Sequence, residues 1–313
     1  MVRYPALVAV LVLVFLFGGN YLITTLIVIA LHAMAALGLS LLMGYTGQIS
    51  LGHAAFYGTG AYGSALIALH IGASPWIAMV AAAAIVGTIG WGLGWLIFRL
   101  RGHHLAMATL GFGVIVHVAL VELHGLTGGP NGLTGIPPFR LLGKDLFLDK
   151  DIFPLAWAAC LVALVVCENL IRSPLGLRMR AVGANERAAA SIGLDPGATK
   201  RWVLALSAVL AALAGSIYGH YIGYLSPNPF SVVFSIKLLL MVAVGGFANI
   251  WGVLFGVAFI TIAGEILRPL GYYDVIVFGA LLVAVMIFFP QGLLHGCGEL
   301  AMRLRERVTK KPA

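Results

Sequence analysis

The chain has 313 residues, of which 61% are hydrophobic and only 10% are charged, and its formal net charge is +8. A soluble domain carries about 25% charged residues, so a water-exposed surface cannot be built from this composition. The composition therefore excludes an ordinary soluble protein and predicts a surface that mostly faces lipid. Because the apolar runs are long and rarely alternate with polar residues, helices are favoured over a β-barrel.

Ten apolar stretches are long enough, or nearly long enough, to cross a bilayer as helices, since a span needs about 20 apolar residues. They are Pro5–Gly18, Tyr21–Met43, Ile49–Ile71, Ser74–Phe98, Leu105–Leu123, Ile152–Ile171, Trp202–Leu225, Ser231–Val244, Ile250–Leu267 and Tyr272–Phe289. The first and eighth are short, and the third is rich in glycine and open to a break. The first has no small-residue cleavage site after it, so we interpret it as a retained span. We predict one all-α, polytopic transmembrane domain over residues 1–313.

The distribution of Lys and Arg predicts the orientation of the chain in the membrane, because cytoplasmic loops carry an excess of both. If all ten stretches cross and the N-terminus is cytoplasmic, 14 of the 19 basic residues lie inside and 4 lie outside, with Lys237 inside a span. Both termini, the loop 172–201 and the basic tail 295–313 are then cytoplasmic, and the loop 125–151 is external. The net positive charge is thus mostly topological, and we expect no nucleic-acid partner.

The cytoplasmic loop contains a short stretch that is typical of a capped helix of about two turns, followed by Asp195 and Pro196, which predict the start of the next helix. A helix this short is not stable alone. Its small central residues suit docking into a groove of a partner, and the alternative is a simple connecting helix on the membrane surface. The candidate docking residues are Asn185 as N-cap, Glu186 and Arg187 as polar anchors, Ala188 and Ala189 as small residues, and Gly193 as C-cap.

Glycines crowd the third span and its flank, and a glycine-interrupted apolar run recurs near the end of the eighth span. Paired interruptions in the two halves of a transporter often mark its solute path, although tight helix packing is the alternative interpretation. The candidate residues for a solute path or a helix break are Gly44, Gln48, Ser50, Gly52, His53, Gly58, Gly60, Gly245 and Gly246. Other ionisable residues in or near spans are His32, His117, Glu122, Lys237 and Glu265, several of which could reach water by snorkelling.

Motifs for chemistry on a substrate are missing from the sequence. No Gly-x-x-x-x-Gly-Lys-Ser/Thr loop for ATP is present, and no metal-ligand spacing or catalytic motif stands out. Gly58, Gly60 and Gly63 match Gly-x-Gly-x-x-Gly, but they lie in an apolar span without a preceding strand, which argues against dinucleotide binding. We expect no cofactor, no metal and no enzymatic activity in this chain.

Two segments resemble a known family. Residues 44–62, GYTGQISLGHAAFYGTGAY, closely resemble the signature of LivM-type permeases of branched-chain amino acid ABC importers. Residues 181–196 resemble the cytoplasmic loop of the same family, with Glu186 and Gly193 in a variant of the EAA pattern. The segment Phe289–Leu294, FPQGLL, fits the family too, and the resemblance extends from about Tyr21 to Leu294.

The resemblance implies a permease subunit in a bacterial inner membrane, moving a solute inward by alternating access. It also implies two partner ATP-binding cassette subunits, a second permease subunit that is a different chain, and a soluble substrate-binding protein. The solute would be a branched-chain amino acid, with urea, amides or aromatic acids as alternatives within the same importer class. A stand-alone secondary carrier would need coupling ionisable groups near the midplane, and an intramembrane enzyme would need paired catalytic groups on facing spans.

Overall fold

The computed structural model describes residues 3–100, 102–141, 143–267 and 273–288, and these are almost entirely helical. Two very short antiparallel pairs join β1 (Leu133–Thr134) to β4 (Tyr224–Leu225) and β2 (Arg140–Leu141) to β3 (Lys144–Asp145). The helices are α1 Arg3–Phe17, α2 Asn20–Ser40, the π-helix η1 Leu41–Tyr45, α3 His53–Ile71, α4 Pro75–Ile97, α5 His103–Glu122, α6 His124–Thr127, η2 Gly129–Asn131, α7 Asp149–Arg172, α8 Pro174–Ala184, α9 Glu186–Ser191, α10 Pro196–Ile222, η3 Asn228–Phe230, α11 Val232–Gly245, α12 Ile250–Leu267 and α13 Tyr273–Phe288.

Six helical stretches in the described part of the chain are long and apolar enough to cross a membrane: α2 with η1, α4, α5, α7, α10 and α12. Shorter apolar helices accompany them at Tyr4–Phe17, Val232–Gly245 and Ile276–Val285. An all-α, polytopic membrane fold is therefore present, whereas the count of ten spans stays a prediction. The basic tail 295–313 and the segment Phe289–Leu294 lie outside the described residues.

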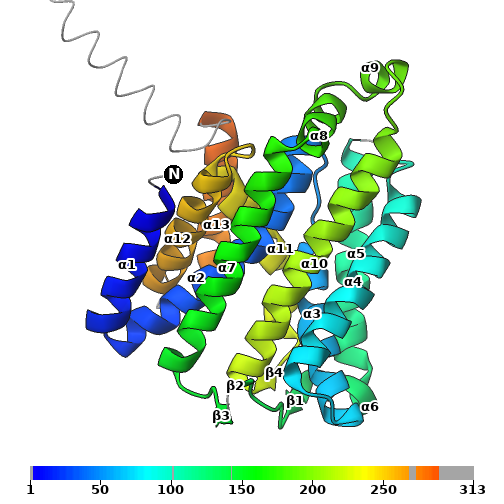
Figure 1. The fold of residues 1–313 in the computed structure, drawn as a ribbon. Coiled ribbons are helices and arrows are strands. Elements are labelled where there is room, and N and C mark those ends of the chain that lie inside the picture. The colour runs from blue at the N-terminus through cyan, green and yellow to red at the C-terminus, as the bar shows by residue number, and fades with distance from the viewer. Residues whose placement is uncertain (1–2, 101, 142, 268–272, 289–313) are drawn as a thin grey trace, which may run out of the picture.

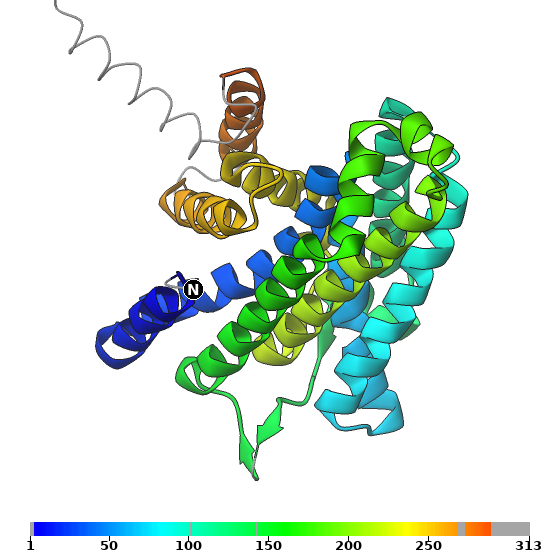
Figure 2. The same ribbon diagram turned by 45° about the horizontal axis from the view of Figure 1, so that its top comes forward.

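α2 and α10 form the centre of the bundle, and most of their residues are buried, whereas few residues of α5 are buried. α10 packs along α3, α4 and α2, and α2 also contacts α7 and α12. Figures 1 and 2 show α3, α4 and α5 on one side of this centre, and α1, α12 and α13 on the other. α8 and α9 project at one end of the bundle, while the strands between α6 and α7 lie at the opposite end (Figure 1).

The capping residues explain where several helices begin. Asp195 Oδ1 accepts a hydrogen bond from the backbone N–H of Ala198 at 3.0 Å, and Pro196 occupies the first turn of α10. The predicted start of this helix is therefore confirmed. α7 begins at Asp149, three residues before the expected Ile152, because Asp149 and Asp151 in its first turn suit the positive end of the helix dipole.

The third predicted span, Ile49–Ile71, was open to a break, and the structure places a non-helical segment at its start. Residues 47–52 are not helical, and α3 begins at His53. The reason lies in Gly47, whose φ of +68° ends the preceding helix, since only glycine adopts this backbone conformation without strain.

Candidate functional site

The non-helical segment 47–52 enters the bundle beside η1, and it is held by polar contacts with several elements. The Thr46 hydroxyl donates to the Leu42 carbonyl at 2.6 Å, and the backbone N–H of Gln48 donates to the same carbonyl at 3.1 Å. Further along, the backbone N–H of Leu51 donates to Thr109 Oγ1 of α5 at 3.0 Å. A π-helix followed by a non-helical segment is a frequent feature of functional sites in membrane helices.

His53 lies at the start of α3 and is completely buried. Its Nδ1 is 3.0 Å from Ser50 Oγ, and its Nε2 is 2.5 Å from Ser207 Oγ on α10. The next residue, Ala54, donates its backbone N–H to Ser235 Oγ of α11 at 2.9 Å. Since both ring nitrogens of His53 have partners, this histidine ties the start of α3 to its surroundings.

The two glycine-rich interruptions meet in space. A Cβ placed on Gly44 would lie 1.7 Å from the carbonyl oxygen of Phe247, in the loop between α11 and α12. The Ser40 hydroxyl donates to this same carbonyl at 2.9 Å, and the Tyr45 hydroxyl donates to the Ala248 carbonyl at 2.8 Å. Backbone contact this close is possible only without a side chain at position 44.

Gly245 and Gly246 shape the partner loop of this contact. A Cβ on Gly245 would lie 2.3 Å from the Gly252 carbonyl oxygen, so α11 and α12 pack closely at their junction. Gly246 follows with a φ of +95° and turns the chain between the two helices. Sequence comparison of the two halves pointed to these residues, but only the fold shows that the loop after them contacts η1 through Phe247 and Ala248.

Three further glycines of the candidate set lie at the packing surfaces of α3. A Cβ on Gly60 would lie 2.4 Å from the Cα of Ala212 on α10, and one on Gly52 would lie 2.6 Å from the Thr109 carbonyl oxygen. At Gly58 the nearest atom would be Cβ of Phe230, at 2.9 Å. The structure thus assigns these positions a packing reason.

α9 has well-formed caps at both ends. Asn185 Oδ1 accepts hydrogen bonds from the backbone N–H groups of Arg187 and Ala188, at 3.0 and 3.1 Å. After the helix, Gly193 donates to the Ala190 carbonyl and Leu194 donates to the Ala189 carbonyl, which is the Schellman pattern. Gly193 has a φ of +85°, as this motif requires. These caps stabilise a helix that is too short to persist alone.

The small residues of α9 do not share one environment. Arg187 and Ala188 are exposed, whereas Ala189 is only 2% exposed and packs inside this chain. A partner can therefore reach Ala188 directly. A bulky side chain at Ala189 would instead disturb the packing of the loop itself.

α8 and α9 touch the helix break through polar and backbone contacts. Glu186 forms an ion pair with Lys200 of α10, and its Oε1 also accepts a hydrogen bond from Gln48 Nε2 at 3.4 Å. A Cβ on Gly183 of α8 would lie 2.5 Å from the Tyr45 carbonyl oxygen. A cavity of about 380 Å³ lies between the two regions and is lined by residues 47–49 and 182–186 among others. The loop at the end of the bundle is thus joined to the broken segment.

Sequence reasoning missed two parts of this arrangement. It missed α8, although Ser173 and Pro174 form an N-cap signal, and the Ser173 side chain accepts from the Leu175 N–H at 3.2 Å. It also placed Lys200 with the loop cations, whereas the structure buries it at 2% exposure beside Phe98 and Glu186. The spacing of 14 residues between Glu186 and Lys200 gave no signal of the pair.

The unequal burial of Glu186 and Lys200 predicts that substitutions of the two residues destabilise the protein to different extents. Glu186→Gln leaves a buried cation without its counter-charge, whereas Lys200→Met leaves Glu186, whose side chain is 31% exposed and can reach water. We expect Glu186→Gln to lower the free energy of unfolding by about 3 kcal/mol and Lys200→Met by less. The double variant should recover part of the loss, because no buried charge then lacks a partner.

Melting temperatures of the purified chain in one detergent provide the measurement for this cycle. Arg140 and Asp145 offer a matched control, since the Asp145 side chain is 31% exposed, like that of Glu186, whereas the Arg140 side chain is 73% exposed. Asp145→Asn should therefore change the melting temperature little. Equal effects of Glu186→Gln and Lys200→Met would contradict the proposed burial of Lys200.

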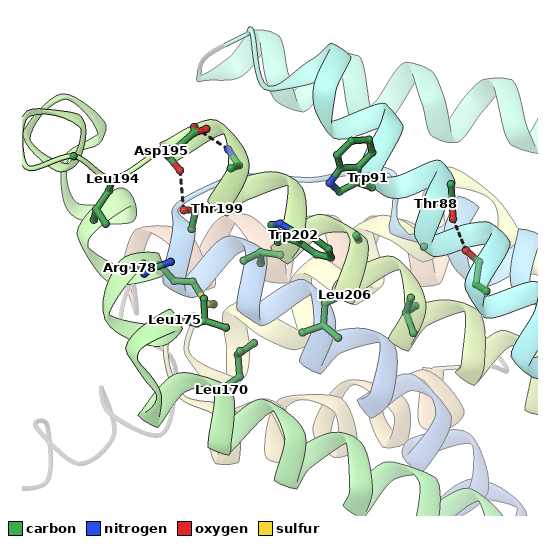
Figure 3. A pocket seen from close by; sticks show the side chains of 18 residues that line it. Thr88, Trp91, Leu170, Leu175, Arg178, Leu194, Asp195, Thr199, Trp202 and Leu206 are labelled. Atoms are coloured by element: carbon green, nitrogen blue, oxygen red, sulfur yellow. Dashed lines mark hydrogen bonds between the residues drawn. The ribbon is translucent and has the colours of Figure 1, made fainter.

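A groove with a volume of about 990 Å³ lies between α4, α7, α8 and α10 and is mostly apolar (Figure 3). Trp91 and Trp202 stand along its wall and Arg178 lies at its α8 side. Its hydroxyls are used internally, since Thr199 donates to the Asp195 carbonyl and Thr88 to the Ala84 carbonyl, each at 2.8 Å. Exposed tryptophans near a helix end suit the membrane interface, so this groove has the character of a lipid-exposed surface.

No group of three or more His, Cys, Asp or Glu side chains that could hold a metal occurs among the residues that the structure describes. The arrangement contains a broken transmembrane segment, close helix crossings and a capped loop that contacts the break. These features define a polytopic helical membrane protein in which a loop at one end contacts a break in a buried transmembrane segment, an arrangement typical of transport permeases.

The family described as "Branched-chain amino acid transport system / permease component" matches residues 21–289. The chain belongs to this family. It is 34% identical over 299 residues to the high-affinity branched-chain amino acid transport system permease protein LivM of Escherichia coli, covering 88% of this chain and 70% of that protein. LivM of Salmonella typhimurium is 33% identical over 287 residues, covering 84% and 68%.

The chain is also similar to LivH, the high-affinity branched-chain amino acid transport system permease protein of that name in Escherichia coli. The identity is 24% over 281 residues, covering 84% of this chain and 91% of LivH. No solved structure matches the chain.

Proposed function

We propose that the chain is the membrane-spanning permease subunit of an ATP-binding cassette importer that moves branched-chain amino acids into the cell. The observation that supports this most is the contact between the capped loop and the helix break, through Glu186, Gln48 and Lys200. A permease needs such a connection if a partner outside the membrane is to move the solute path. The names of the LivM and LivH relatives support the solute class.

In this proposal α9 is the coupling helix. Closure of the partner ATPase dimer on ATP displaces α9, and the displacement reaches η1 through Gly183, Tyr45 and Gln48. Segment 47–52 then changes the position of α3 relative to α10. The π-helix and the non-helical segment provide the hinge for this movement, and ATP hydrolysis on the partner resets it.

The proposed assembly contains this chain, a second and different permease chain, two cassette ATPase subunits and a soluble substrate-binding protein. It lies in a bacterial inner membrane, with residues 1–313 as one permease domain. α8 and α9 are at the cytoplasmic end and the loop 125–151 is at the external end. The 14 to 4 asymmetry of Lys and Arg supports this orientation.

Cysteine labelling provides a test of the orientation. Arg187→Cys and Leu148→Cys place exposed thiols at the two opposite ends of the bundle. In intact cells a membrane-impermeant maleimide should label position 148 and leave position 187 unlabelled until the cells are opened. Labelling of position 187 in intact cells would overturn the orientation.

Uptake by cells that depend on this chain tests the function itself. Deletion of the chain should abolish high-affinity uptake of leucine, isoleucine and valine while uptake of proline by other carriers continues. The cassette ATPases should also copurify with the permease. Normal branched-chain amino acid uptake with lost uptake of urea, an amide or an aromatic acid would instead assign the importer to that solute.

A further inference from the structure

A cavity of about 370 Å³ lies between α2, α3, α10, η3 and the first turns of α11. This volume is in the range of sites for small molecules. Its lining includes His32, halfway along α2, and Tyr57, one turn into α3. The cavity therefore reaches the interior of the bundle beside the first turns of α3, the helix that follows the non-helical segment 47–52.

Two polar atoms on the cavity wall lack hydrogen-bond partners within the described part of the chain: the Tyr57 hydroxyl and His32 Nδ1. Tyr57 is only 2% exposed, and its ring packs against those of Phe234, Tyr218 and Phe230, with centroids 5.2 to 6.0 Å apart. A buried hydroxyl that has no partner is unfavourable, so such a group points to a ligand that supplies the partner.

Positive potential converges on the same cavity. α11 begins at its wall, with Ser231 at the N-cap position making no side-chain cap hydrogen bond, so backbone N–H groups of the first turn face this region. Lys237 lines the cavity one turn further, and its Nζ lies 4.8 Å from the ring centre of Phe278. A helix start together with a lysine at this depth favours an anion, and both are uncommon in a membrane.

Apart from Asn228, the rest of the wall is apolar and aromatic. Val28, Val233, Phe230 and Phe234 contribute side chains of a size that suits an aliphatic group. The His32 ring lies 5.0 Å from that of Phe234, which closes this side of the cavity. The site thus combines an anion-binding end with an aliphatic wall.

We propose that this cavity binds the transported solute as a free amino acid, with its carboxylate at the start of α11, near Lys237 and the Tyr57 hydroxyl. The proposal rests on the proposed function and adds to it a binding site within the permease. The Tyr57 O–H donates to the carboxylate, and the aliphatic side chain lies against Phe230 and Phe234. Uncharged solutes such as urea and amides offer no carboxylate to the start of α11 and the Tyr57 hydroxyl.

Charge-selective thiol labelling of the assembled transporter tests the anion-binding end without reference to any solute. Ser231→Cys places a thiol at the start of α11, and Phe147→Cys serves as an exposed control near the same end of the bundle, both in a chain whose three native cysteines are replaced. The rate ratio of an anionic to a cationic methanethiosulfonate should be at least about fivefold higher at position 231 than at position 147. Lys237→Met should remove most of this preference, and an equal ratio at both positions overturns the proposal.

L-Leucine and 3-methylbutylamine, which lacks the carboxylate, provide the second readout. Leucine should slow labelling of position 231 at least about threefold and leave position 147 unchanged, and 3-methylbutylamine should protect far less. Tyr57→Phe should weaken the protection by leucine. Normal leucine uptake without protection overturns this site and leaves the proposed function intact. Loss of the proposed function would appear separately, as an assembled transporter that takes up no branched-chain amino acid while the anion preference at position 231 persists.

Discussion

Gly60→Ala and Gly215→Ala are each expected to destabilise the bundle severely, although each adds a single methyl group. A Cβ at position 60 would lie 2.4 Å from the Cα of Ala212, and one at position 215 would lie 1.9 Å from the Tyr57 carbonyl oxygen. Both obstacles are backbone atoms, so α3 and α10 must separate to make room. We expect a loss of at least about 3 kcal/mol in the free energy of unfolding, at the upper end of overpacking effects.

Gly92 and Gly111 provide matched controls in α4 and α5, because a Cβ on either would meet nothing within 4 Å. There the substitution to Ala should stabilise by about 0.5–1 kcal/mol, since glycine is unfavourable in a helix interior. Melting temperatures and the yield of folded protein in detergent measure both effects. If the Gly60→Ala variant had the same melting temperature as the two control variants, the close packing of α3 against α10 would be contradicted.

The glycine positions show how far the sequence could predict this fold. Apolar helices follow from composition, because exposure to lipid is a property of each stretch by itself. The crowding of Gly52, Gly58 and Gly60 predicted a break or a close contact, but the partner atoms of each glycine lie on α5, η3 and α10. Those partners are set by the packing of segments far apart in the chain, which no local pattern records.

The loop 172–201 shows the same difference between features that a local pattern predicts and features that depend on long-range packing. The capping residues Asn185 and Asp195 identified helix starts, because a cap acts within four residues of chain. The burial of Lys200 and the exposure difference between Ala188 and Ala189 depend on how α9 lies over α10, and neighbouring alanines look alike in sequence. Long-range contacts therefore account for the parts of the site that sequence reasoning missed.

The proposed mechanical role of the site rests on the contact between the loop that carries α9 and the non-helical segment 47–52. Gln48 lies in the broken segment and Glu186 in α9, and 138 positions of sequence separate them. Their hydrogen bond links α9 to the broken segment, and Gly183 of α8 lies close to Tyr45 of η1, so we expect a displacement of α9 to reach η1. A rigid, unbroken helix at 47–52 would resist such a displacement, which is a physical reason for glycine at position 47.

Ala188→Trp is expected to disconnect the permease from its ATPase while the chain stays folded in the membrane. The Ala188 side chain is exposed on α9, so a large ring meets no atom of its own chain but overfills the groove of a fitted partner. Overpacking of about 1–3 kcal/mol corresponds to association about 5-fold to 150-fold weaker, and uptake should fall with it. Copurified ATPase and uptake of labelled leucine are the two measurements.

Ala189→Trp and Leu148→Trp separate docking from other effects of a bulky ring. Ala189 is buried, so its substitution should lower the melting temperature of the isolated permease, which Ala188→Trp should not do. Leu148 is exposed at the opposite end of the bundle, and Leu148→Trp should leave ATPase association and melting temperature unchanged. If Ala188→Trp kept full ATPase association and full uptake, α9 would not be the coupling helix, and the link between Glu186 and Gln48 would serve only to hold the loop against the bundle.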